Sequence, residues 1–165
     1  MGISIDVLLR QVRSLFDLEV IMMKRYMNYS IVYAVLALVG GVFYREFTKL
    51  NGYTNWTTLS VVHTHYFILG MMLFLILGLI SMNMNLKINR AVLFYNNGLN
   101  LTAIMLIVRG IIQVLDLNVV SALISGIASI GHIILGVSLI LILLDIKKGC
   151  IKGGFSIHLF FDIIT

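Results

Sequence analysis

Hydrophobic residues in this chain gather into four long runs, each separated from the next by a short polar segment. The runs cover about residues 27–47, 59–83, 91–115 and 119–144. A helix needs about 20 apolar residues to cross a bilayer, and each run is long enough. Short connections join neighbouring helices in antiparallel order. The pattern therefore predicts an all-α integral membrane protein, an up-down bundle of four transmembrane helices.

The segments outside the four runs have patterns of their own. In residues 1–25, apolar side chains recur at helical spacing with charged side chains opposite them, which predicts an amphipathic helix lying on the inner leaflet or on a neighbouring protein. Residues 148–165 are apolar but too short to span a bilayer. We therefore divide the chain into an N-terminal extension (1–25), a transmembrane domain (26–147) and a short tail (148–165).

Composition supports the membrane class. The chain is 60% hydrophobic and only 12% charged, whereas a soluble domain carries about 25% charged residues. It contains no proline, so its helices can run unbroken. A net charge of +5 would suggest nucleic acid as the partner of a soluble protein. In this chain lysine and arginine flank membrane spans, so we expect the lipid bilayer as partner and no nucleic acid.

The basic residues are distributed unequally between the two sides of the predicted bundle. Only Arg45 and Lys49 fall on the side opposite the N-terminus. The side of the N-terminus has nine: Arg10, Arg13, Lys24, Arg25, Lys87, Arg90, Lys147, Lys148 and Lys152. The positive-inside rule then places both termini in the cytoplasm.

Three histidines lie within the apolar runs, where a polar side chain is costly and is a functional candidate. His63 and His65 begin the second run, and His132 lies about halfway along the fourth. Neutral imidazole is the commonest biological metal ligand, so all three are candidate metal or haem ligands. The small residues around His132 also allow a simpler role, because such stripes let membrane helices pack closely.

Helical geometry separates the first two histidines. Residues i and i+2 point about 200° apart, so His63 and His65 cannot share one metal in a regular helix. His63 shares a face with Gly70 and Gly78, so we expect it to point into the bundle. His65 should then face a neighbouring chain or the interface.

Arg109 lies near the middle of the third run and needs a partner or access to water. Gln113 and Asp116 follow at i+4 and i+7 and share its face, and Glu46 ends the first run. One interpretation is a structural clamp between Arg109 and either acidic residue. The other is a cofactor site in which Arg109 and Gln113 take part, with Arg109 neutralising a haem propionate.

Three stretches carry a resemblance to a known family: GGVFYREFTKLNGYT, TTLSVVHTHYFILGMM and GHIILGVSLILILL. From roughly Lys24 to Lys147 the chain resembles small bacterial four-helix membrane proteins, the domain of unknown function 2871. The resemblance implies the four-span architecture and a multi-pass protein of the bacterial inner membrane. It brings no assigned activity. A shorter likeness links the intramembrane histidines and the LG and GM pairs after them to haem–copper-oxidase-type membrane proteins.

Two functions remain open. The first is a site for haem b or a transition metal, built from the histidines with Arg109. The second is a non-redox binding, transport or assembly component, expected to form a homo-oligomer, whose His and Arg residues make a structural polar network. The sequence has no CxxCH or HExxH motif, no phosphate-binding glycine loop and no nucleophile set beside a base. We therefore assign no catalytic residue and do not expect an enzyme.

Overall fold

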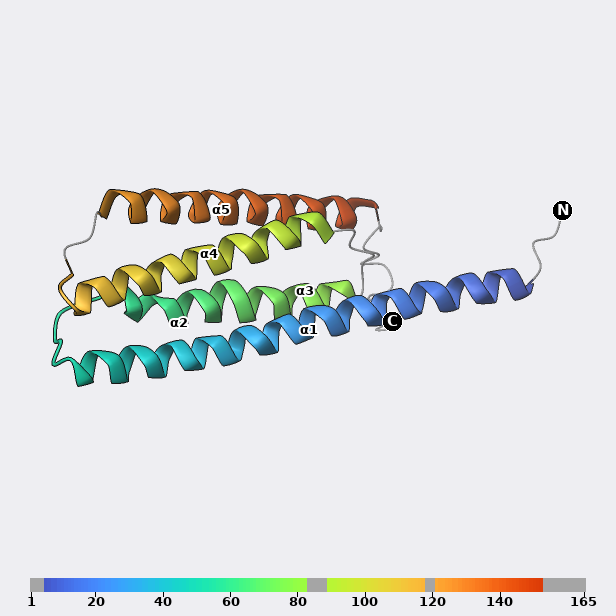
Figure 1. Ribbon diagram of the computed structural model, residues 1–165. Helices are drawn as coiled ribbons and strands as arrows, with labels where there is room; N and C mark the ends of the chain where they lie inside the picture. Colours follow the sequence, from blue (N-terminus) through green and yellow to red (C-terminus); the bar gives the residue numbers. More distant parts are fainter. Residues whose placement is uncertain (1–4, 83–88, 118–120, 153–165) are drawn as a thin grey trace, which may run out of the picture.

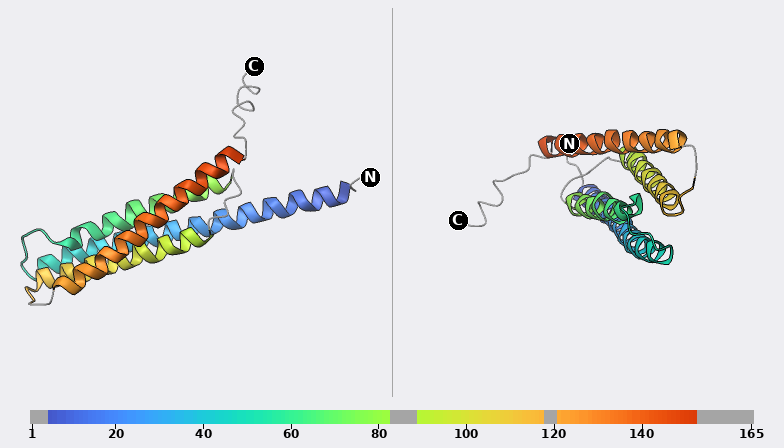
Figure 2. Two further views of the ribbon diagram at one scale, coloured as in Figure 1. Left: turned by 90° about the horizontal axis from the view of Figure 1, so that it is seen from above. Right: turned by 90° about the vertical axis from the view of Figure 1, so that its left-hand side faces the viewer.

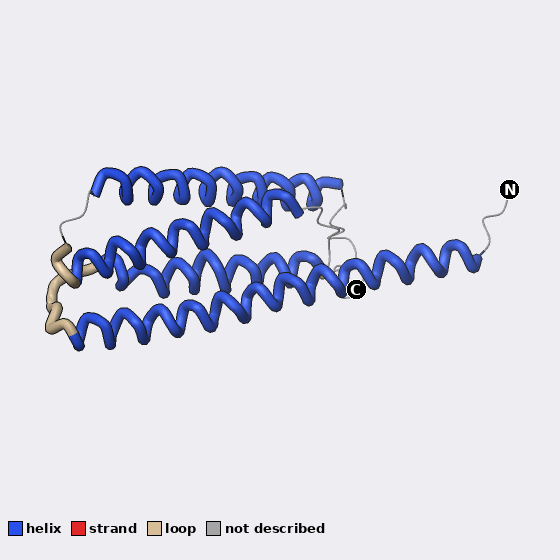
Figure 3. Tube along the Cα trace, viewed as in Figure 1, coloured by secondary structure: helices blue, strands red, loops and turns tan. Residues whose placement is uncertain are grey.

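The computed structural model describes residues 5–82, 89–117 and 121–152, and these residues are helical apart from short connections (Figures 1 and 3). Most of the predicted tail, residues 153–165, lies outside the described residues. The elements in chain order are α1 (Ile5–Leu50), a 3₁₀ turn (Thr58–Val61), α2 (Val62–Thr64), a π-helical stretch (His65–Met72), α3 (Leu73–Ser81), α4 (Asn89–Val114) and α5 (Ser121–Lys152).

Four helical segments are long and apolar enough to cross a membrane: Glu19–Leu50, Thr58–Ser81, Arg90–Val114 and Ile124–Gly149. They confirm the four predicted spans and the all-α membrane fold. The segment Thr58–Ser81, called span 2 below, joins the 3₁₀ turn, α2, the π-helical stretch and α3 into one rod. The end of the bundle that holds residues 51–57 and 115–117 is called the loop end.

Helix α1 is longer than the predicted first span. It runs for 46 residues without a break and extends beyond the other helices (Figure 1). No proline occurs in the chain, and no glycine lies between Gly2 and Gly40, so nothing interrupts the helical hydrogen bonds at residue 25. The predicted N-terminal helix is present, and it is continuous with the first span.

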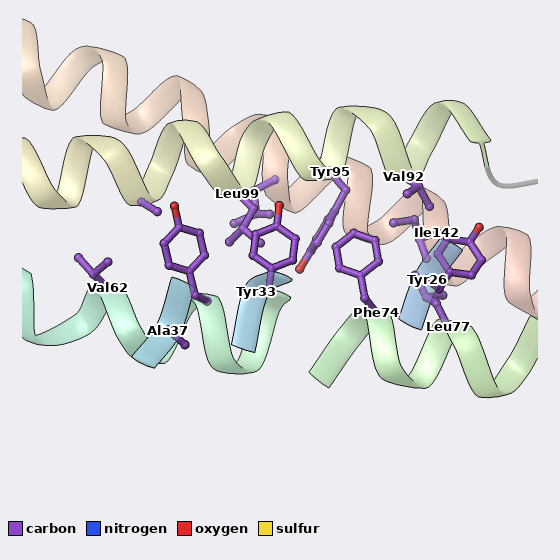
Figure 4. Close-up of a cluster of buried hydrophobic side chains, with 13 residues drawn as sticks. Tyr26, Tyr33, Ala37, Val62, Phe74, Leu77, Val92, Tyr95, Leu99 and Ile142 are labelled. Carbon is purple, nitrogen blue, oxygen red and sulfur yellow. The ribbon is translucent and has the colours of Figure 1, made fainter. Parts of the chain in front are cut away.

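The four spans pack as two pairs that meet at the core. Within the bundle, α1 lies against span 2, and α5 lies against α4 (Figure 2). Helix α4 also contacts span 2, mainly nearer the loop end. The buried side chains between the pairs include Tyr33, Phe74 and Tyr95 (Figure 4). Large apolar side chains on the outer faces, such as Leu38 and Ile133, are exposed. A bilayer would cover these faces, as expected of a multi-pass membrane protein.

Glycines permit the closest helix contacts. A Cβ atom added to Gly98 would lie 2.8 Å from the backbone nitrogen of Leu135, so α4 and α5 touch through their backbones. A Cβ atom added to Gly131 would lie 2.9 Å from the hydroxyl oxygen of Thr102. Small residues are the usual means of such close approach in membranes. These contacts fix the register of α5 against α4.

Candidate cofactor site

The rings of two histidines from different helices lie close together in the structure. His65 begins the π-helical stretch of span 2, and His132 lies near the middle of α5. Their ring centres are 6.2 Å apart and their planes are nearly perpendicular, at 85°. The side chain of His65 is half-buried and that of His132 is exposed. The chain therefore brings together two imidazoles separated by 67 residues in the sequence.

Backbone hydrogen bonds orient both rings in the same way. The Nδ1 atom of His65 lies 2.9 Å from the carbonyl oxygen of Val61, and that of His132 lies 2.9 Å from the carbonyl oxygen of Ala128. A carbonyl oxygen only accepts, so each Nδ1 must carry the hydrogen. In a neutral ring, Nε2 then has a free lone pair. This arrangement is typical of metal-ligating histidines, whose other nitrogen is held by a second group.

His63 occupies a different place, against α1. Its ring lies beside Gly41, where an added Cβ atom would be 3.9 Å from Cγ of His63. Among the described residues, its buried Nδ1 atom has no hydrogen-bond partner. The expected angular separation of His63 and His65 is therefore observed: His63 lies against α1, and His65 lies beside His132 of α5.

The space beside the histidine pair is open along α5. A Cβ atom added to Gly136, one turn from His132, would meet nothing within 4 Å. Ser125 and Ser129, on the other side of His132, are exposed and small, and the hydroxyl of Ser129 donates to the carbonyl oxygen of Ser125 at 2.8 Å. A flat ligand would therefore meet little steric hindrance along this face of α5.

Among the described residues, Arg109 does not form the ion pair that a structural clamp would need. Neither Glu46 nor Asp116 lies within ion-pair distance of Arg109, whose side chain is exposed, and Glu46 lies 3.8 Å from Arg45 instead. Helix α4 ends at Val114, and Asp116 has a φ of 49°. The i+7 relation requires a helix that continues through position 116. The backbone leaves the helix before then, so Asp116 is not held on the face of Arg109.

Gln113 has a structural partner rather than a free side chain. Its Oε1 atom accepts from the backbone N–H of Thr58 at 2.9 Å and from the hydroxyl of Thr57 at 3.1 Å. These bonds satisfy donors at the start of span 2, where backbone N–H groups have no helical partner. Gln113 therefore anchors span 2 to α4 near the loop end.

A buried network of tyrosine and asparagine was not predicted from the sequence. The hydroxyl of Tyr33 donates to Oδ1 of Asn96. The side-chain nitrogen of Asn100 donates to the oxygen of Tyr33 at 2.9 Å, and the hydroxyl of Tyr66 donates to Oδ1 of Asn100 at 3.5 Å. We call Tyr33, Tyr66, Asn96 and Asn100 the Tyr–Asn network. It joins α1, span 2 and α4.

The π-helical stretch accepts further hydrogen bonds from its neighbours. The hydroxyl of Tyr95 on α4 donates to the carbonyl oxygen of Leu69 at 2.7 Å, and the hydroxyl of Ser30 on α1 donates to that of Met71 at 3.0 Å. A π-helix shifts backbone bonds from i+4 to i+5, and such segments are frequent at functional sites. The ring of Tyr33 packs on Gly70, where an added Cβ atom would be only 2.6 Å from Cγ.

Comparison with known proteins adds a family and no activity. The model of a family described as "Protein of unknown function (DUF2871)" matches residues 23–149. The match includes the first span from residue 23, the other three spans whole, and all the residues of the histidine pair and the Tyr–Asn network. No curated protein and no solved structure matches the chain.

Proposed function

The chain belongs to the DUF2871 family, and we propose that it is a membrane protein that binds b-type haem between His65 and His132. One observation carries this proposal: the 6.2 Å separation of two rings whose Nδ1 atoms are both held by backbone carbonyls. Two metal–nitrogen bonds of about 2 Å, plus the distance from each ring centre to Nε2, span roughly 6 Å. The separation therefore suits an iron atom between the rings.

Haem suits this pair better than a bare metal ion. Among the described residues, no group of three or more His, Cys, Asp or Glu side chains could hold a metal ion. Two imidazoles alone leave a transition metal with too few protein ligands for a stable site. A porphyrin supplies four nitrogens of its own and needs only axial ligands from the protein. The sequence has no CxxCH motif, so the haem would be held without thioether bonds.

Ligation by two histidines would favour electron transfer over chemistry on a bound molecule. His65 and His132 would both hold the haem, and the haem would supply electron-transfer chemistry when bound. This agrees with the sequence, in which we assign no catalytic residue. The roles of His65 and His132 are to ligate iron, and the roles of Val61 and Ala128 are to fix the ring orientation through their carbonyl oxygens.

Arg109 would bind the haem propionates. On α4 it follows Thr102 by two helical turns, about 10 Å toward the loop end. Thr102 packs against Gly131, the residue before His132, so it marks the depth of the histidine pair. The Arg109 side chain is exposed and, among the described residues, forms no ion pair. A guanidinium at this position can form paired hydrogen bonds with a carboxylate.

The decisive experiment compares three alanine variants purified in mild detergent with haem supplied during expression. The wild type should show a Soret band and one b-type haem per chain after pyridine extraction. His65→Ala and His132→Ala should each lose most of the bound haem. His63→Ala is the matched control, because it removes a histidine from the same span that faces α1, and it should keep the haem.

Two results would overturn the haem proposal. A colourless wild type after expression with excess haem would favour the non-redox function predicted from the sequence. Haem kept by His65→Ala but lost by His63→Ala would move the site to the side of α1. Size-exclusion chromatography of each apoprotein separates lost haem from lost fold.

We also propose that both termini face the cytoplasm of a bacterial inner membrane. The end of the bundle opposite the loop end has four described basic residues: Lys24, Arg25, Arg90 and Lys148. The loop end has Arg45 and Lys49. The positive-inside rule places the more basic end in the cytoplasm. A phosphatase reporter that is active only outside should be inactive when fused after Lys148 and active when inserted at Asn55. The reverse pattern would invert the topology.

A further inference from the structure

A basic hollow lies on α1 at the end opposite the loop end. It has a volume of about 420 Å³ and is lined by Ile21, Lys24, Arg25, Asn28 and Tyr29. We propose that this hollow binds the headgroup of an anionic glycerophospholipid, with the acyl chains lying along α1 toward the middle of the bundle. The proposal is independent of the haem site, because it uses other residues and a different ligand.

The chemistry of the lining favours a phosphate ester. Two of its side chains are cationic, Asn28 supplies an amide donor, and no carboxylate is among the lining residues. The Arg25 guanidinium lies 5.8 Å from the ring centre of Tyr29, a cation–π contact that holds the arginine in place. Lysine, arginine and amide donors are the groups that recognise phosphate oxygens in proteins.

The positive charge of the hollow is not neutralised by an ion pair within the described part of the chain. The ion pairs among the described residues are Arg45 with Glu46 and Lys148 with Asp145, and neither includes Lys24 or Arg25. Arg45, at the loop end of the same helix, thus has a carboxylate neighbour at 3.8 Å. The two cations of the hollow therefore have no ion pair among the described residues, whereas Arg45 at the loop end of the same helix has a carboxylate neighbour.

The surface next to the hollow suits acyl chains. Positions that continue the line of Lys24 and Asn28 along α1 at helical spacing are Ile31, Val35 and Leu38. These side chains are 60%, 54% and 64% exposed, so they form an apolar track toward the middle of the bundle. A free phosphate would use only the hollow, whereas a phospholipid would use both surfaces.

The test measures lipid retention by native mass spectrometry of the full chain in mild detergent. Phosphatidylglycerol and phosphatidylcholine with the same acyl chains are added separately. The wild type should retain phosphatidylglycerol preferentially. The double variant Lys24→Gln/Arg25→Gln should bind it more weakly, by about five-fold for each charge removed. The change Asn28→Leu should also weaken retention, although it leaves the net charge unchanged.

The matched control is Arg45→Gln/Lys49→Gln, which removes the same charge from the loop end of the same helix. It should retain phosphatidylglycerol as the wild type does. If both double variants lost phosphatidylglycerol equally, net charge alone would explain the retention, and the proposed site would be overturned. Equal retention of phosphatidylcholine would exclude headgroup recognition. Displacement of the lipid by glycerol 3-phosphate at similar concentration would show that the hollow binds a soluble phosphate ester and not a lipid.

Discussion

The Tyr–Asn network and the histidine pair both place polar groups on the apolar spans, and they differ in where their hydrogen bonds go. In the network, side chains from three helices bond to one another, as Asn100 does to Tyr33. In the histidine pair, each ring bonds only to a carbonyl oxygen of its own helix, four residues earlier. The two rings face each other at 6.2 Å without a hydrogen bond between them.

This difference separates a structural role from a binding role. A polar group in lipid must be satisfied, and the network achieves this within the protein. In each histidine, Nδ1 donates a hydrogen bond to a backbone carbonyl oxygen, and Nε2 of the neutral ring keeps a lone pair. This contrast supports a structural role for the network and the proposed ligand-binding role for the histidine pair.

The largest effect should come from His132→Ala, which would remove one of the two proposed haem ligands. We expect nearly complete loss of the Soret band, because His65 would then have to hold the haem alone. The apoprotein should melt at nearly the wild-type temperature, since the exposed ring bonds only to Ala128 of its own helix. Absorption spectroscopy and thermal melting of the same samples check both parts. A large loss of apoprotein stability would assign His132 to the structural class instead.

Asn100→Ala should have the opposite effect: it should lower stability and leave haem binding intact. It removes a donor to Tyr33 and an acceptor for Tyr66, so the free energy of unfolding should fall by about 1–3 kcal/mol. Haem binding should persist, because His65 and His132 are unchanged. Asn97→Ala is the control, since Asn97 is exposed on the same helix and should be neutral. Equal destabilisation by both variants would remove the special role of the network.

A smaller effect is expected at the loop end. Gln113→Ala removes the acceptor for the Thr58 backbone N–H and should lower the free energy of unfolding by about 1 kcal/mol. Denaturant titration in detergent measures this change, with Asn55→Ala in the exposed loop as control. Loss of haem without loss of stability would restore the cofactor-binding role first predicted for Gln113.

The smallest change in structure should follow Arg109→Gln. The exposed side chain makes no described ion pair, so stability should be unchanged. Removing a positive charge near the propionates favours ferric over ferrous haem, and the midpoint potential should fall by tens of millivolts. Redox titration of the bound haem checks the sign. An unchanged potential would place the propionates away from Arg109 while leaving the histidine ligands intact.

The spans were predictable because hydropathy is a property of each segment alone. Twenty or more apolar residues between polar ends define a membrane helix whatever its neighbours are. The Tyr–Asn network also had a signal that was overlooked: Asn96 and Asn100, four residues apart, share one face of an apolar span. Two amides on one face of a membrane helix predict partners on adjacent helices.

The pairing of His65 with His132 could not be predicted from single helices. It depends on the register between span 2 and α5, which is set by contacts such as that of Gly131 with Thr102. The expectation that His63 points inward used α-helical spacing through Gly70 and Gly78. Residues 65–72 are π-helical, yet His63, Gly70 and Gly78 all lie against α1, so the shared face is present. The Arg109–Asp116 pairing is absent among the described residues, because α4 ends at Val114 and the i+7 relation needs a continuous helix.

The π-helical stretch gives span 2 an unusual sensitivity to length. A π-turn is structurally an α-helix with an inserted residue, so removing one residue between His65 and Met72 would let the rod return to regular α-helix. Each residue turns an α-helix by about 100°, so the parts before and after the deletion would rotate relative to each other by roughly that amount. Either His65 would turn away from His132, or Phe74 would turn away from Tyr33. A conservative substitution in this segment would leave both orientations unchanged. The deletion of one residue would instead change the orientation of His65 relative to that of Phe74.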